Sequence, residues 1–93
     1  MPTLRIAHLR EQGQNMVIVP LDSSFGQKTS SEQATLIAAI QRASTSAGLA
    51  GTVVPVWETA GRMHFIAPRP WHPYFQRLSM PAIAQNLNKT LSW

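Results

Sequence analysis

Cysteine is absent from this 93-residue chain, so the protein can form neither a disulfide nor a thiolate metal site. Long apolar runs are absent too: the longest extends from Met16 to Leu21, far short of the about 20 residues that a membrane-spanning helix needs. Residues 1–6 contain no apolar stretch of the kind found in signal peptides. We therefore expect a single domain, residues 1–93, in the cytoplasm and without a membrane partner.

Charge is also scarce. Charged residues make up 13% of the chain, against about 25% in typical soluble domains. Only four residues are acidic and eight are Lys or Arg, so the formal net charge is +4. A basic balance favours acidic partners such as nucleic acid, whereas a surface with few charges favours association with another protein chain. We give the second property more weight and expect a homodimer or a protein partner.

The first half of the chain predicts two strands and a helix. Residues 3–10 alternate in polarity as a half-buried strand does, and residues 16–21 are apolar on both faces, as in a central strand. A helix is expected over residues 31–47, with Ser30 or Ser31 as its cap. Either Thr29 and Glu32 or Ser30 and Gln33 have the spacing of a capping box, and Gly48 follows the apolar stripe of the helix. The opposite side of this helix carries few charges and is expected to be covered by another subunit: Ala38, Ser44, Thr45 and Ser46.

The second half predicts a β-hairpin with strands at residues 53–57 and 62–67, and Pro55 favours a sheet edge for the first of them. A short helix should begin at Pro73, and a second helical segment should carry Ile83, Leu87 and Leu91 on one face to the end of the chain. This ββα-ββαα order predicts an α+β fold. We expect a four-stranded, mostly antiparallel sheet in the order 1-2-4-3, with the helices on one face.

The most distinctive part of the sequence is residues 68–77, here called the proline-aromatic segment. It combines three prolines, three aromatic residues, two arginines and a histidine. Prolines stiffen a chain, and aromatic and arginine side chains anchor many interfaces, so the segment should either form a contact surface or close the core. With two residues of the preceding strand, the candidate binding residues are Arg62, His64, Arg69, Trp71, His72, Tyr74 and Arg77.

Motifs for chemistry are missing or incomplete. The three histidines lack the spacing of a zinc site, and Asp22-Ser23-Ser24 lacks a nucleophile elbow. Residues 26–30 lack the first glycine of a nucleotide-binding loop, although Lys28 and a helix start could hold one phosphate. Residues 78–93 resemble the opening of a helix-turn-helix but leave no room for a recognition helix.

We therefore expect no catalytic, metal-binding or cofactor-binding residues. The sequence favours a non-enzymatic module that self-associates or binds a protein partner through the proline-aromatic segment. The alternative is a small basic nucleic-acid-binding protein, in which aromatic rings stack on bases and arginines neutralise phosphates.

Overall fold

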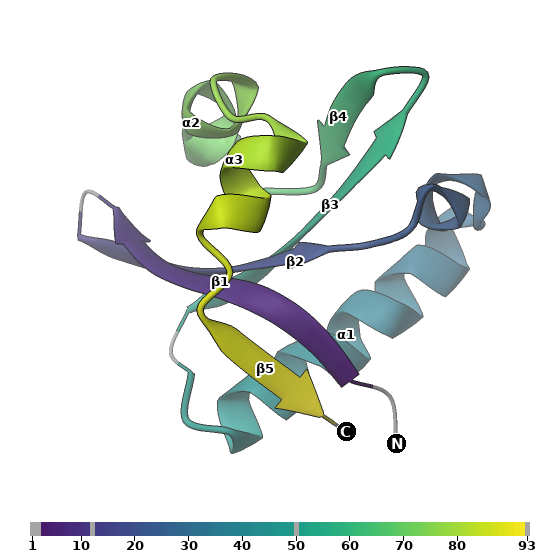
Figure 1. Ribbon diagram of the computed structural model, residues 1–93. Coiled ribbons are helices and arrows are strands. Elements are labelled where there is room, and N and C mark those ends of the chain that lie inside the picture. Colours follow the sequence, from purple (N-terminus) through teal and green to yellow (C-terminus); the bar gives the residue numbers. More distant parts are fainter. Residues whose placement is uncertain (1–2, 12, 50, 93) are drawn as a thin grey trace.

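The computed structural model describes residues 3–11, 13–49 and 51–92. In this part of the chain five strands form one sheet in the order β4-β3-β2-β1-β5 (Figure 1). Their bounds are β1 (Thr3–Glu11), β2 (Gln14–Pro20), β3 (Thr52–Thr59), β4 (Arg62–Phe65) and β5 (Lys89–Ser92). Only β2 and β3 are parallel, and the other neighbouring pairs are antiparallel. The α+β class is confirmed, but the sheet is mixed and has five strands, so the expected four-stranded sheet and its 1-2-4-3 order are wrong.

Helix α1 (Ser30–Ser46) joins the parallel strands β2 and β3, a connection that a tight turn cannot make. It follows a short 3-10 helix, η1 (Ser23–Gln27). Of the two predicted capping-box pairs, Thr29 and Glu32 form one: Glu32 N–H donates to Thr29 Oγ1 and Thr29 N–H donates to Glu32 Oε1, both at 3.1 Å. The N-cap is therefore Thr29, and the prediction of Ser30 or Ser31 as the cap is wrong. Gly48, with φ at +80°, follows the last turn in a conformation that favours glycine.

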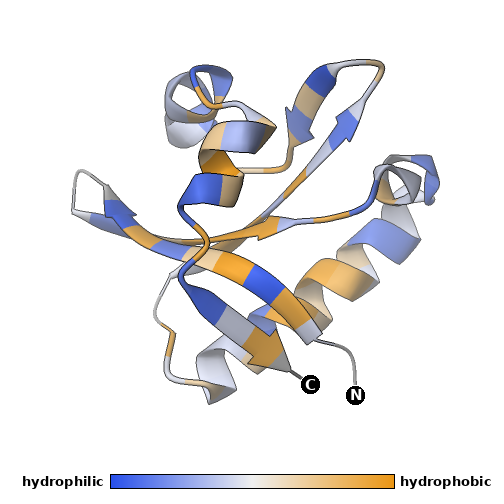
Figure 2. Ribbon diagram, viewed as in Figure 1, coloured by the Kyte–Doolittle hydropathy of each residue, from blue (hydrophilic) through white to orange (hydrophobic). Residues whose placement is uncertain are grey.

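Helices cover both faces of the sheet, so the expectation that they would cover one face is wrong. Helix α1 packs on one face, and α2 (His72–Gln76) and α3 (Met80–Gln85) pack on the other (Figure 1). The physical reason lies in β2, where residues 16–19 are all buried, because a strand apolar on both sides needs two covers. Figure 2 shows the apolar residues of the central strands between the two helical layers.

Two core clusters result. The cluster under α2 and α3 contains Ala7, Met16, Ile18, Val54, Val56, Phe75 and Ile83. The cluster under α1 contains Ile6, Val17, Val19, Ile40, Val53 and Leu91.

Pro55 does not mark a sheet edge. It lies in β3, between β2 and β4, and pairs with Val19. On its other side the Ile66 N–H donates to the Pro55 carbonyl at 3.1 Å, and β4 has already ended at Phe65. The sheet tolerates this proline because its missing N–H falls where the pairing with β4 ends.

The expected second helical segment is confirmed only over α3, which ends at Gln85, and the end of the chain is the strand β5. Ile83 and Leu87 pack in the cluster under α3, whereas Leu91 is buried in the cluster under α1, so one helix face could not carry all three. Asn88 starts β5 by imitating a strand partner: its Oδ1 accepts from the His8 N–H at 2.9 Å and its Nδ2 donates to the His8 carbonyl at 3.0 Å. A strand over Lys89–Ser92 agrees with the interpretation that the resemblance to a helix-turn-helix is a chance likeness.

Candidate interaction surface

The proline-aromatic segment folds as a 3-10 helix, η2 (Arg69–Trp71), followed by α2, and its rings close the core. Phe75 is fully buried, and its ring centroid lies 5.4 Å from that of Phe65 and 5.2 Å from that of Tyr74. Trp71 and Tyr74 are half-buried against the same cluster. The aromatic side chains thus take the core-closing role, while a contact role for the rest of the segment stays a prediction.

His72 fixes the start of α2 to the end of the hairpin. Its Nε2 lies 3.0 Å from the Ala67 carbonyl oxygen, and its ring meets the Phe65 ring edge-on at 5.2 Å. Because a carbonyl oxygen can only accept, Nε2 must carry a proton in this contact. Half-buried and bonded in this way, His72 holds the segment on the sheet.

Arg62 and His64 lie on the other face of the hairpin, away from α2. The exposed His64 ring stacks on Trp57, with centroids 5.8 Å apart, and Trp57 meets Phe25 of η1 edge-on at 5.0 Å. Arg62 shares the side of His64 because side chains alternate along a strand. The seven predicted binding residues therefore do not form one site.

What remains exposed around α2 is basic and proline-lined. Arg69, Pro70, Pro73 and Arg77 are exposed, and an open depression of about 300 Å³ is lined by Pro70, Pro73, Tyr74 and Arg77. We call η2 and α2 with these exposed residues the basic surface. Its rigid proline wall stands beside a guanidinium group that can pair with a carboxylate or a phosphate.

The charges are divided unequally along the chain. Residues 1–58 contain four basic and all four acidic residues, whereas residues 59–93 contain four basic residues and no acidic one. The whole net charge of +4 therefore belongs to residues 59–93, which form β4, η2, α2, α3 and β5. The basic residues are spread evenly along the chain, so the division follows from the acidic residues, which all lie before residue 59.

Exposed apolar area does not explain the low charge density. Among the described residues, Ile66 is the one large hydrophobic side chain that counts as exposed, at 40%. Large apolar side chains therefore do not take the place of the missing charges on the surface of the described residues. Ser44, which was expected on an exposed helix face, is fully buried, and its hydroxyl donates to the Gln41 carbonyl at 3.0 Å.

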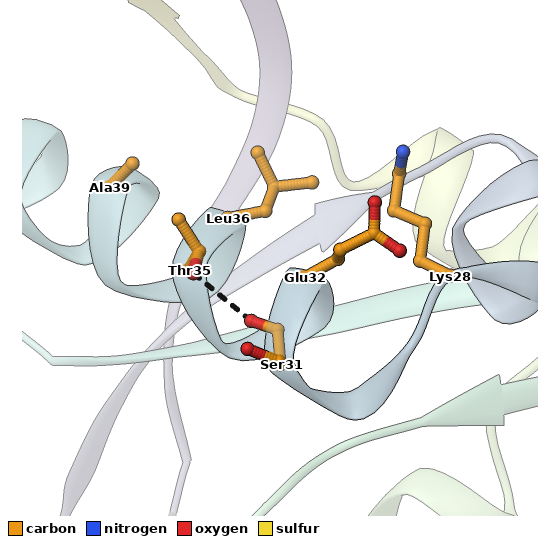
Figure 3. A pocket seen from close by; sticks show the side chains of 6 residues that line it. All are labelled: Lys28, Ser31, Glu32, Thr35, Leu36 and Ala39. Carbon is orange, nitrogen blue, oxygen red and sulfur yellow. Dashed lines mark hydrogen bonds between the residues drawn. The ribbon is translucent and has the colours of Figure 1, made fainter.

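A second hollow, of about 390 Å³, runs beside the N-terminal half of α1 and is lined by Lys28, Ser31, Glu32, Thr35, Leu36 and Ala39 (Figure 3). Lys28 and Glu32 stand next to each other at one end of it. The hydrogen bond from the Thr29 backbone, with smaller effects of the Thr29 hydroxyl and the Lys28 charge, lowers the pKa of the exposed Glu32 carboxyl. Glu32 is therefore an anion at neutral pH.

The described residues contain no group of three His, Asp or Glu side chains placed to hold a metal ion. No helix within the described ranges is both long and apolar enough to cross a bilayer. No family model matches the chain, and no curated protein and no solved structure shows significant similarity to it.

Proposed function

We propose that this protein is a non-enzymatic interaction module whose basic surface binds an acidic segment of a partner protein. The observation that carries the proposal is the division of charge: residues 59–93 hold the full net charge of +4, and Arg69 and Arg77 are exposed beside the proline-lined depression. This part of the sequence contains no acidic residue, and an excess of positive charge favours a negatively charged partner.

The shape of the basic surface also suits a peptide. Proline fixes its own backbone, so the depression loses little conformational freedom when a partner binds. The half-buried Tyr74 ring forms an apolar wall, and Arg77 offers a planar group that can pair with a carboxylate through two hydrogen bonds.

A second copy of the chain is a poor partner for this surface. A twofold interface places the same patch of both copies face to face, so Arg69 and Arg77 would lie close to the same two arginines of the other copy. Like charges brought together in this way oppose association. The partner of the basic surface should therefore be acidic and different.

Nucleic acid is the second candidate, because the same acid-free surface would attract phosphates. Base stacking has less support, since Phe75 is buried and the rings of Phe65, Trp71 and Tyr74 pack against the core. Binding of single-stranded nucleic acid would then rest on phosphate contacts, with an affinity that depends steeply on salt.

Fluorescence anisotropy with two labelled probes, a glutamate 20-mer and a deoxythymidine 20-mer, would test both ideas at two salt concentrations. The variant Arg69→Ala/Arg77→Ala removes two charges from the basic surface. The matched control Arg5→Ala/Arg10→Ala removes two exposed charges from β1. At about 0.2–1 kcal/mol for each exposed ion pair, the first variant should weaken peptide binding about two- to thirtyfold, and the control should not.

Equal losses in the two variants would show that only net charge matters, and the basic surface would no longer be a site. Tighter binding of the deoxythymidine probe, with a log–log salt slope of about −0.7 for each phosphate contacted, would place nucleic acid first.

A further inference from the structure

One exposed side of α1 carries a stripe with a regular spacing. Its members are separated alternately by three and four residues: Glu32, Thr35, Ala39, Arg42 and Ser46. At 3.6 residues per turn these positions fall within about 80° of arc. All are exposed except Ala39, which is half-buried. The spacing is that of the seam along which helices of a coiled coil meet.

The stripe is complementary to itself. If two copies of α1 lie antiparallel about a twofold axis at the level of residue 37, each position faces the one equally far on the other side of the centre. Thr35 then faces Ala39, and Glu32 faces Arg42. Further out, Ser46 at the end of α1 is neutral, so within the helix no two like charges are directly opposed. A twofold interface requires this kind of self-complementarity.

From this arrangement we propose that two copies of the chain associate through α1, antiparallel, with Glu32 of each copy paired with Arg42 of the other. The inference goes beyond the proposed function and does not depend on it, because α1 and the basic surface lie on opposite faces of the sheet (Figure 1).

The surroundings of the stripe fit this contact. The short side chains of Thr35 and Ala39 allow two helices to approach closely, and the hollow of about 390 Å³ beside them can receive side chains of the second helix (Figure 3). Glu32 uses Oε1 to accept the Thr29 N–H. A carboxylate has further lone pairs, so it can accept from a guanidinium as well.

The expected dimer is weak. A helix of 17 residues is about 25 Å long, and one such helix from each copy buries less than the roughly 1,200 Å² of typical stable interfaces. We therefore expect monomers at low micromolar concentration and dimers towards millimolar concentration.

A charge-exchange experiment tests the pairing. Arg42→Glu places Glu against Glu across the twofold axis, and Glu32→Arg places Arg against Arg, so each variant alone should dimerise at least about tenfold more weakly than the wild type. An equimolar mixture of the two variants should recover dimers, because both pairs across that heterodimer are again oppositely charged. Sedimentation velocity from 5 µM to 1 mM measures each case, with Arg5→Glu, on β1, as a control expected to match the wild type.

Glu32→Arg loses half of the capping box, so circular dichroism should first verify that this variant is folded at the temperature used. Arg42→Glu leaves the capping box intact and tests the pairing independently of it. A wild type that is monomeric at 1 mM would overturn the proposal, and so would variants that dimerise like the wild type. A mixture that does not regain dimers would overturn the reciprocal pairing. Binding of the glutamate 20-mer should be unchanged in Arg42→Glu, which separates this proposal from that for the basic surface.

Discussion

Replacing Phe75 with alanine should lower the free energy of unfolding by about 3–5 kcal/mol. The Phe75 ring is 0% exposed and is flanked by the rings of Phe65 and Tyr74 at 5.4 and 5.2 Å. Removing the ring loses the stabilising free energy of its burial and leaves a cavity beneath α2. At about 0.05–0.15 kcal/mol per residue, the whole protein is stable by about 5–14 kcal/mol, so this one ring accounts for a large share.

Thermal and urea unfolding would measure the loss. At about 4–8 °C for each kcal/mol, the melting temperature of Phe75→Ala should fall by about 12–40 °C. Phe75→Leu, which keeps most of the volume, should cost no more than about 1.5 kcal/mol and provides a folded intermediate case. Gln76→Ala, at the exposed neighbouring position of α2, is the matched control and should stay within about 0.5 kcal/mol of the wild type.

The reasoning is refuted if Phe75→Ala unfolds within about 1 kcal/mol of the wild type, because fully buried phenylalanines cost more than that to remove. The aromatic residues of the proline-aromatic segment would then not close the core, and they would again be candidates for a contact surface.

Two further predictions concern η1 and the start of α1. A Cβ on Gly26 would lie 2.5 Å from Nε1 of the Trp57 indole, so Gly26→Ala should lower the free energy of unfolding in urea by about 1–3 kcal/mol. This cost exceeds the about 0.4–1 kcal/mol by which alanine stabilises a protein through a less flexible unfolded chain. The penalty should disappear when Trp57 is already leucine, and an equal penalty in both backgrounds would contradict the clash. Because folding lowers the pKa of Glu32, its contribution to stability is complete above the unfolded value near 4.3 and is lost as pH falls through the lower folded value. The wild type should therefore lose stability relative to Glu32→Gln, which does not titrate, as pH falls below about 5, and parallel pH profiles would argue against this linkage.

Elements with a strong local pattern were predictable from the sequence. The polarity of β1 and β2 and the capping box of α1 depend on residues within a few positions of one another, and so does the turn between β3 and β4. The pairings of β1 with β5 and of β2 with β3 were not predictable in this way, whereas the β1–β2 and β3–β4 pairings were predicted. Asn88, for example, forms hydrogen bonds with the backbone of His8, 80 positions earlier, and no sequence pattern near Asn88 indicates that partner.

Two predictions were wrong although the rules behind them are sound: the helical segment at the chain end and the edge position of Pro55. Leu87 and Leu91 have helical spacing, but they pack on opposite faces of the sheet. One side of a helix cannot reach both faces, so the chain between these residues passes from one face to the other. Pro55 was assigned to an edge because it cannot donate a hydrogen bond. In the sheet, the missing N–H of Pro55 is on the side of β4, next to the point where β4 ends. A proline in a central strand is therefore acceptable where the one hydrogen bond that it cannot donate is not needed.

The candidate site was predictable in part. The composition of residues 68–77 located the segment, but composition could not separate the buried Phe75 from the exposed Arg69 and Arg77 on the same stretch. Burial depends on which side of α2 meets the sheet, and a helix of five residues is too short to show that side in its sequence pattern. The division of charge at residue 58 was readable from the start and bears more directly on a partner than the aromatic content does.

That division also suggests which surface can meet which partner. Helix α1 lies within the electrically neutral first 58 residues and presents Glu32 and Arg42 at positions that exchange under a twofold axis, so a second copy is an acceptable partner there. The basic surface carries no acidic residue to exchange with, so the same symmetry would bring only like charges together. Because the sheet separates the two surfaces, a pair joined through α1 would keep both basic surfaces directed outward, where two acidic segments could bind without displacing either copy.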